Sequence, residues 1–181
     1  MVINKAYILV KDKKSNSIIE EIIRSTFENV DVTIENNVFS VSTIDDDAFQ
    51  IKLTKMHRLI MSDFNVDVSI LIIPFYDEIF KKYLAKVNDG VSTVFDVFLR
   101  TINDDSTKAD CKEILSNIEK KDLDTIKAFL MCNANSCVTA NELYLHRNSL
   151  NYRMNSFISN TSMDIRDINT LMFLKLILCI N

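Results

Sequence analysis

The first half of the chain alternates between two hydrophobic periods, one typical of strands and one typical of helices. "AYILV", from Ala6 to Val10, is an apolar run of strand length. "DVTIENNVFSVSTI" has a period of two on both sides of Asn36 and Asn37, which tolerate left-handed turns, so it predicts a hairpin. Between these segments, apolar residues recur on one helical face: Ile18, Ile19, Ile22, Ile23 and Phe27.

A second helix and a fourth strand follow the hairpin. The aspartates from Asp45 to Asp47 indicate a helix start, and "VDVSILIIPF" predicts a strand that Pro74 closes. The resulting order is β-α-β-β-α-β, which predicts an antiparallel sheet covered by two helices on one face. The apolar face of the second helix comprises Phe49, Leu53, Met56, Leu59 and Ile60.

After the fourth strand the pattern is helical only. "YDEIFKKYLAKVND" and "VSTVFDVFLRTIN" predict two helices separated by Gly90, the single glycine of the chain. "DDSTKADCKEILSNIEKKD" then predicts a connector helix with Ser106 as its cap. We therefore expect an α+β protein, with an antiparallel-sheet domain over residues 1–95, a helical connector over 96–121 and an all-α domain over 122–181.

The all-α domain is predicted to contain a helix-turn-helix. Asp122 is expected to cap its first helix. A second, short helix runs from about Cys137 to Tyr144, and a third begins near Arg147. The second helix carries Ala140 where the pair must pack closely, as in a helix-turn-helix whose last helix can enter the DNA major groove. The apolar stripe of the third helix is narrow and consists of Leu150, Met154, Phe157 and Ile158.

The other face of the third helix is polar and lacks acids. "LYLHRNSLNYRMNSF" contains neither Asp nor Glu, although the whole chain has a net charge of -4. Solvated helix faces usually mix Lys with Glu, and this stretch has neither residue. Asparagine can bond to adenine, arginine to guanine, and hydroxyl groups to phosphate, whereas an acid would repel phosphate. The pattern therefore leaves two interpretations open, a DNA-binding face and a merely solvated one.

Eight residues of this stretch are candidate DNA contacts. We expect His146 to cap the helix more than to read a base, and Arg153 is as well placed for an ion pair within the domain as for phosphate. Tyr152 has two open interpretations, a phosphate donor or half-buried packing. The candidates are His146, Arg147, Asn148, Ser149, Asn151, Tyr152, Arg153 and Asn155.

The same residues carry a resemblance to a known family. "DLDTIKAFLMCNANSCVTANELYLHRNSLNYRMNSF" resembles the C-terminal helix-turn-helix domain of the PucR and sugar-diacid-regulator family of bacterial transcription factors. The family pattern "T-A-x-x-L-x-[IL]-H-R-N-T-L-x-Y-R-[LM]" is met from Thr139 to Met154, with Ser149 in place of threonine, and "MDIRDINTLMFLKLILCI" matches the closing helix. The resemblance runs from Leu123 to Ile180 and implies a transcription regulator that places Arg147 near DNA.

The first half is similar to another domain that this family often contains. Its element order resembles that of a degenerate GGDEF-like domain. At the hairpin tip, however, "ENNVF" from Glu35 to Phe39 stands where a cyclase has Gly-Gly-Asp-Glu-Phe. The nucleotide and metal roles of that motif therefore do not carry over, and we expect a vestigial sensor or dimerisation domain. Family members commonly have a separate sensory domain upstream; here we expect a stand-alone regulator or one that answers to a partner protein, with an unknown effector.

The composition of the chain argues against several classes of protein function. An acidic pI of about 5.2 argues against a protein that coats nucleic acid or anionic membrane along its whole surface. One glycine cannot build a P-loop or a dinucleotide fingerprint, and two histidines leave little for a zinc site or a catalytic triad, although cysteine and carboxylate ligands stay open. We therefore expect no enzyme activity, no cofactor and no metal.

The cysteines and the apolar runs indicate the compartment. The four cysteines form no Cys-x-x-Cys pair and are interpreted as small core residues, and the N-terminus does not resemble a signal peptide, so we expect the cytoplasm. The longest apolar run, Leu171 to Ile180, is interrupted by Lys175, whereas a membrane span needs about 20 residues. No membrane span is predicted.

The favoured function is sequence-specific binding of double-stranded DNA by a homodimer. The closing helix from Ile165 to Ile180 is apolar almost all round, which either burial within the chain or a subunit interface would explain. In a homodimer we expect this helix or the first-half sheet in the interface. The rival hypothesis is a repurposed helix-turn-helix that binds another regulator instead of DNA, and the low basic content favours it. A nucleotide-sensing first domain is a third hypothesis, opposed by the shortage of glycine and the missing GGDEF motif.

Overall fold

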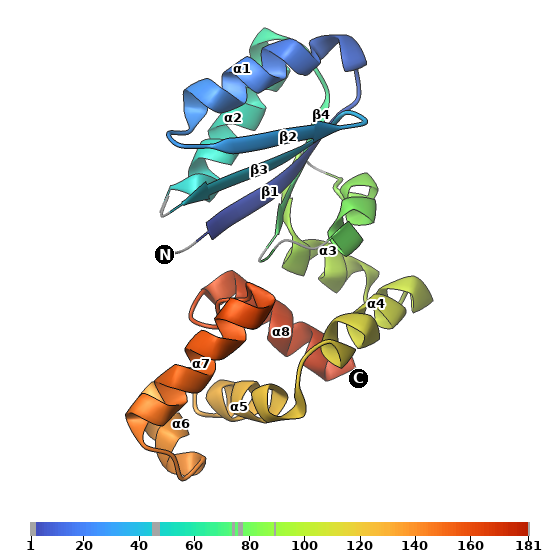
Figure 1. Ribbon diagram of the computed structural model, residues 1–181. Coiled ribbons are helices and arrows are strands. Elements are labelled where there is room, and N and C mark those ends of the chain that lie inside the picture. Colours follow the sequence, from blue (N-terminus) through green and yellow to red (C-terminus); the bar gives the residue numbers. More distant parts are fainter. Residues whose placement is uncertain (1–2, 45–47, 74, 76–77, 89, 181) are drawn as a thin grey trace. The chain divides into compact units, whose positions relative to one another are not determined.

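A computed structural model describes residues 3–44, 48–73, 75, 78–88 and 90–180. The chain divides into two compact units, Met1–Val97 and Phe98–Asn181, which are described separately (Figure 1). The expected helix start at Asp45 to Asp47 and the expected strand end at Pro74 lie outside the described residues.

The first unit is built on a sheet of five strands in the order β2-β3-β1-β4-β5. Strand β1 is central and pairs antiparallel with both β3 and β4, and β2 pairs antiparallel with β3. The element order predicted from the sequence, β-α-β-β-α-β, is confirmed as far as β4, and so is the α+β class. The strands are β1 (Ile3–Val10), β2 (Asp31–Glu35), β3 (Val38–Ile44), β4 (Val68–Ile73) and β5 (Val91–Thr93).

The fifth strand was not predicted, and it makes the sheet mixed. Val91 to Thr93 was expected to begin a helix, but it forms β5, which runs parallel to β4 with Val91 opposite Ile70. A capping box explains the boundary: the Asp96 carboxylate accepts from the Thr93 backbone N–H at 3.0 Å, and the Asp96 N–H donates to the Thr93 hydroxyl at 3.2 Å. This pair starts α3 (Val94–Thr101) one residue after the strand.

The segment before β5 is also tighter than predicted. The expected α-helix is a 3-10 helix, η2 (Glu78–Lys86), whose buried Phe80 and Tyr83 lie three residues apart, the repeat of that helix type. Lys81 connects η2 to the end of β2, because its amine lies 2.8 Å from the carboxylate of Glu35 and 2.7 Å from that of Glu78. The hydrogen bond to Glu35, followed by that to Glu78, raises the pKa of Lys81.

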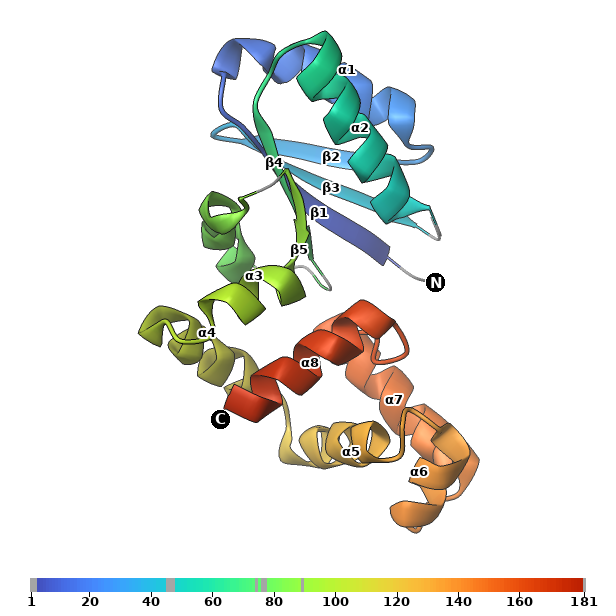
Figure 2. The ribbon, with the colours of Figure 1, turned by 180° about the vertical axis from the view of Figure 1, so that it is seen from behind.

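Two helices, α1 (Asn16–Thr26) and α2 (Phe49–Asp63), cover one face of the sheet, as predicted (Figures 1 and 2). They bury their apolar stripes against alternate residues of the strands, which form the core of this unit. Fully buried core residues include Ile8, Ile19, Ile23, Phe39, Leu53, Ile60 and Ile70.

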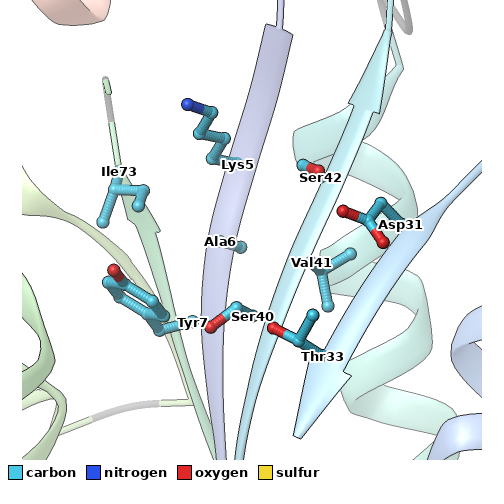
Figure 3. A pocket seen from close by; sticks show the side chains of 9 residues that line it. All are labelled: Lys5, Ala6, Tyr7, Asp31, Thr33, Ser40, Val41, Ser42 and Ile73. Carbon is cyan, nitrogen blue, oxygen red and sulfur yellow. The ribbon is translucent and has the colours of Figure 1, made fainter. Parts of the chain in front are cut away.

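The opposite face of the sheet carries a pocket of about 290 Å³. Figure 3 shows its side chains on neighbouring strands, where the register places Ser42 between Asp31 of β2 and Lys5 of β1. Burial lowers the pKa of the Lys5 amine. The residues that line the pocket are Lys5, Ala6, Tyr7, Asp31, Thr33, Ser40, Val41, Ser42 and Ile73.

The described residues of the second unit after α3 form only helices and the turns that connect them. Two helix starts differ from the sequence prediction. Ser106 and Asp122 were expected to be caps, but Asp104 and Glu119 occupy the cap positions, so both predicted caps lie inside the first turn. The cause is backbone geometry, since Asp104 and Glu119 are the extended residues that precede each helix. The helices are α4 (Asp105–Ser116), α5 (Lys120–Met131), α6 (Ser136–Glu142), α7 (Arg147–Thr161) and α8 (Ile168–Ile180).

The apolar closing helix α8 is covered from within its own unit. It packs against α4, and the ring of Phe173 lies 5.2 Å from that of Phe98 in an edge-to-face arrangement. Ile168, at its start, remains 62% exposed. In the part of the chain that the structure describes, no helix is long and apolar enough to cross a membrane.

The cysteines fit the predicted core role only in part. All four are free thiols, and Cys111 is buried, where burial raises its pKa to about 11. Cys137 and Cys179 are exposed, so the interpretation of these two as core residues was wrong. The buried residues of their helices are Thr139 and Ala140 in α6 and Thr170, Phe173, Leu174 and Ile177 in α8.

Replacing Gly90 should test the turn that leads into β5. Gly90 has a φ of +72°, and an added Cβ would lie 2.3 Å from the ring of His57. We expect Gly90→Ala to lower the free energy of unfolding by about 1 to 3 kcal/mol, measured by urea denaturation. Adding His57→Ala should restore the part caused by the ring and leave the part caused by φ. Equal stability of Gly90→Ala and the parent chain would contradict this account.

Candidate nucleic-acid interface

Helices α5 and α6 are joined by a turn that asparagine makes possible. Asn133 and Ala134 have φ values of 53° and 57°. The Ala134 N–H donates to the carbonyl of Phe129 at 2.8 Å and the Asn133 N–H to that of Leu130 at 3.2 Å, which is the Schellman pattern that closes a helix.

Asn135 then starts α6. Its side-chain oxygen accepts from the backbone N–H groups of Cys137 at 3.0 Å and Val138 at 3.2 Å. This is the bonding expected of an N-cap residue, which satisfies donors that the first turn of a helix cannot. The predicted start near Cys137 was therefore correct to within one residue, whereas the helix ends at Glu142, two residues earlier than expected.

A second Schellman turn separates α6 from α7. The Leu145 N–H donates to the carbonyl of Ala140 at 2.8 Å and the Tyr144 N–H to that of Asn141 at 3.1 Å. His146 follows as the N-cap of α7, and its ring Nδ1 accepts from the Asn148 N–H at 3.2 Å, as predicted from the sequence.

The two helices pack through small and apolar side chains. Ala140, at the centre of α6, is 3% exposed, and helix α7 lies against α6 and α5. The buried stripe of α7 consists of Leu150, Met154 and Phe157, and Leu150 is fully buried. The α6-turn-α7 segment is thus the helix-turn-helix that the sequence predicted (Figure 2).

The opposite face of α7 points to solvent and carries no acid. Asn148, Tyr152 and Asn155 follow one another at helical spacing on the side away from the buried stripe, and all three are exposed. Tyr152 is 76% exposed, which does not fit the half-buried packing that was one of its two interpretations. The exposed candidates Ser149 and Asn151 lie on the two sides of this row.

The two arginines of α7 have different surroundings. Arg147 is exposed at the first residue of the helix. Arg153 is half-buried, and its charge lies close enough to Asp122 of α5 to favour the ionised acid. Burial nevertheless raises the pKa of Asp122, and it outweighs the opposing effects of Lys121 and Arg153. Arg147 is therefore the more accessible cation, and Arg153 is partly engaged within the unit.

Sequence reasoning missed one cation beside this face. Arg166, in the turn before α8, is exposed, and its guanidinium reaches the side-chain oxygen of Asn155 at 3.5 Å. Its orientation is fixed by Asp164, whose carboxylate accepts from the Arg166 Nε at 2.9 Å and lies 3.2 Å from its second amino nitrogen. The hydrogen bonds to Arg166 help to lower the pKa of Asp164, although burial alone would raise it. In the sequence, the one sign of this ion pair was that Asp164 and Arg166 have opposite charges and lie two residues apart.

This helix-turn-helix matches a described family. Residues 122–180 match the PucR C-terminal helix-turn-helix domain. The second unit of the chain contains a PucR-type helix-turn-helix domain. The resemblance seen in the sequence is confirmed, and the match includes α6, α7, the turn between them and the closing helix α8.

Two further similarities involve bacterial proteins. Over 54 residues, the chain is 44% identical to the uncharacterized protein YxkF of Bacillus subtilis (strain 168), covering 30% of this chain and 18% of that protein. The chain thus matches less than a fifth of the length of this relative. It is also 15% identical to a regulator of polyketide synthase expression from Bifidobacterium adolescentis, whose crystal structure aligns with a TM-score of 0.45 over 98% of this chain and 79% of that one.

Removing the cap of α6 should weaken the PucR-type domain. We expect Asn135→Ala to lower the free energy of unfolding by about 1 kcal/mol, because two backbone donors lose their acceptor. Urea denaturation followed by circular dichroism measures this loss. Asn141→Ala is the matched control, since Asn141 is an exposed interior position of the same helix and alanine is the better helix former. A control variant that loses as much stability as Asn135→Ala would contradict the assigned cap.

Proposed function

We propose that this protein is a transcription regulator that binds double-stranded DNA sequence-specifically through α7. The observation that carries the proposal is the exposed, acid-free face of α7 within a PucR-type domain. A helix presented in this way can enter the major groove, where base edges differ in their donors and acceptors. The first turn of α7 would lie deepest in the groove.

Each candidate residue has a role that its surroundings support. Arg147 and Asn148 lie in the first turn and are assigned to base edges, since arginine and asparagine bond bidentately to guanine and adenine. Ser149 and Tyr152 have hydroxyl groups suited to phosphate, and Asn151 and Asn155 extend the polar surface. His146 would contribute by capping the helix, and Arg153 would add positive charge from its half-buried position.

The local charge supports this proposal in an otherwise acidic chain. Between Ile126 and Met163 the formal charges are Lys127, Glu142, Arg147 and Arg153, a net +2, against -4 for the whole chain. Attraction to phosphate would therefore be confined to the helix-turn-helix region. Binding should weaken steeply with salt, because phosphate contacts release counterions.

The remaining parts of the chain receive supporting roles in the proposal. Residues 1–95 would be a vestigial GGDEF-like sensor or dimerisation domain, 96–121 a helical connector and 122–181 the DNA-binding domain. The GGDEF signature is absent from the hairpin tip, where Asn36 and Asn37 form the turn, so we propose no enzyme activity and no cofactor. Four free cysteines agree with a reducing cytoplasm.

A selection experiment tests the proposal. Genomic fragments from the source organism are selected by the purified chain at about physiological salt, in parallel with Arg147→Ala. We expect the parent chain to enrich a defined sequence, and the variant to bind it more weakly by about 1 to 3 kcal/mol because it loses a bidentate base contact. Fragment sequencing and fluorescence anisotropy measure the two quantities.

Lys127→Ala is the matched control for this selection. Lys127 is an exposed basic residue of the same domain, on α5, and its loss removes one positive charge without changing α7. The control should still enrich the same sequence. If the folded parent chain enriches nothing, or if Arg147→Ala selects the same sequence with the same affinity, the proposed reading of bases by α7 is wrong.

The proposed regulator should be a homodimer. Helix-turn-helix proteins generally pair to read two half-sites one helical turn, about 10 base pairs, apart. Sedimentation equilibrium at micromolar concentration should therefore give about twice the 20.9 kDa mass of one chain. The selected sequence should contain two related half-sites. A monomer at this concentration would contradict the dimer, and with it the interface expected at α8 or at the sheet of the first unit.

A second candidate function is an interaction module without DNA binding. The net charge of -4 favours it, since overall acidity opposes association with phosphate. In this case the helix-turn-helix would serve a dimer that modulates another regulator. The selection experiment separates the two functions, because an interaction module enriches no DNA sequence.

A further inference from the structure

Tyr144, in the turn between α6 and α7, has an unusual backbone conformation. Its φ is 52°, in the left-handed region, where the side chain of an L-residue lies too close to the following carbonyl. It occupies the position after the helix cap in the Schellman turn, which most proteins fill with glycine or asparagine. For a bulky residue this conformation is a genuine outlier.

At the other positions with positive φ, asparagine is the most frequent residue. Among the described non-glycine residues with positive φ, five of eight are asparagine. Asn133 fills the equivalent position in the preceding Schellman turn. Tyr144 is the single aromatic residue among the eight. The turn geometry itself therefore does not explain the tyrosine.

Packing does not explain it either. Tyr144 is 97% exposed, so its ring contributes almost nothing to the folded core. The buried residue beside this turn is Ala140, whose carbonyl accepts from the Leu145 N–H. A strained residue that the fold does not need suggests a function at that position.

We propose that Tyr144 is a DNA-contacting residue whose hydroxyl group donates to a backbone phosphate beside the groove that α7 enters. This inference rests on the proposed function. Tyr144 lies three residues before Arg147, so it adjoins the end of α7 that would enter the groove, where the sugar-phosphate chains form the groove walls. Tyrosine hydroxyls are established phosphate donors in protein–DNA interfaces, and such contacts fix the position of the protein without reading sequence.

The proposal predicts opposite effects on stability and on DNA binding. Tyr144→Gly relieves the left-handed strain, so its urea midpoint should be higher than that of the parent chain. The same variant should bind DNA about tenfold more weakly, the loss typical of a hydrogen bond to a charged group. Tyr144→Phe keeps the ring, and it should show the same weakening with an unchanged urea midpoint.

Two binding measurements identify the contact as one to phosphate. Each Tyr144 variant should lose affinity by the same factor for the duplex enriched by the parent chain and for a scrambled duplex of equal length, since phosphate is common to both. The slope of log affinity against log salt should stay unchanged, because a neutral hydroxyl releases no counterion. Arg147→Ala, in contrast, should lower the affinity for the selected duplex more than for the scrambled one.

The outcomes separate this inference from the proposed function. If Arg147→Ala loses sequence-specific binding while Tyr144→Phe and Tyr144→Gly bind both duplexes like the parent chain, the DNA-binding function stands and the Tyr144 contact is refuted. A loss in Tyr144→Gly but not in Tyr144→Phe also refutes the proposed hydroxyl contact. If the folded parent chain binds neither duplex, both the function and the inference fail.

Discussion

The structure depends on left-handed turn positions that a chain with one glycine must fill with other residues. Glycine adopts these conformations without steric cost, and asparagine is the usual substitute because its side chain is short and can bond locally. Here Asn36 and Asn37 form the tip of the β2–β3 hairpin and Asn133 closes α5. The hairpin sets the register of the sheet, and the α5 turn sets the direction of α6. The register of the sheet and the direction of α6 therefore both depend on the residues that form these turns.

The helix-turn-helix adds a sequence of caps to these turns. Asn135 starts α6, the Schellman turn at Tyr144 ends it, and His146 starts α7. Each of the two N-caps fixes where its helix begins, and the helical spacing of Leu150, Met154 and Phe157 sets which side of α7 is buried. Leu150, buried against the rest of the unit, then leaves the polar side chains of α7 facing water. The chemistry proposed for that face thus follows from local backbone bonding together with a three-residue apolar stripe.

Much of the fold could be predicted because strong periodic signals agree with local turn chemistry. Alternation on both sides of Asn36 and Asn37 predicted the hairpin, and the helical spacing from Leu150 to Phe157 predicted α7. The errors of prediction occur at a short strand and at two helix starts. Three residues from Val91 are too few to show strand periodicity, and pairing with β4 decides their conformation. The caps at Asp104 and Glu119 were missed because several acids compete for each position.

The candidate site was predictable in composition but not in surroundings. The acid-free polar face followed from the sequence alone, and so did the cap role of His146. The exposure of Tyr152, the half-buried position of Arg153 and the approach of Arg166 to Asn155 depend on how the helices pack. The strain at Tyr144 had no sequence signal at all, since nothing in "LYLH" separates a left-handed residue from its neighbours.

NMR mapping tests most directly whether DNA contacts the outward face of α7. The ¹⁵N-labelled chain is titrated with duplex DNA, and the amide and side-chain amide signals are followed. The account predicts that the largest shifts occur at Asn148, Tyr152 and Asn155, with the signals of α1 unchanged. Shifts concentrated outside the α6–α7 segment, or no shifts with DNA in excess, would contradict it.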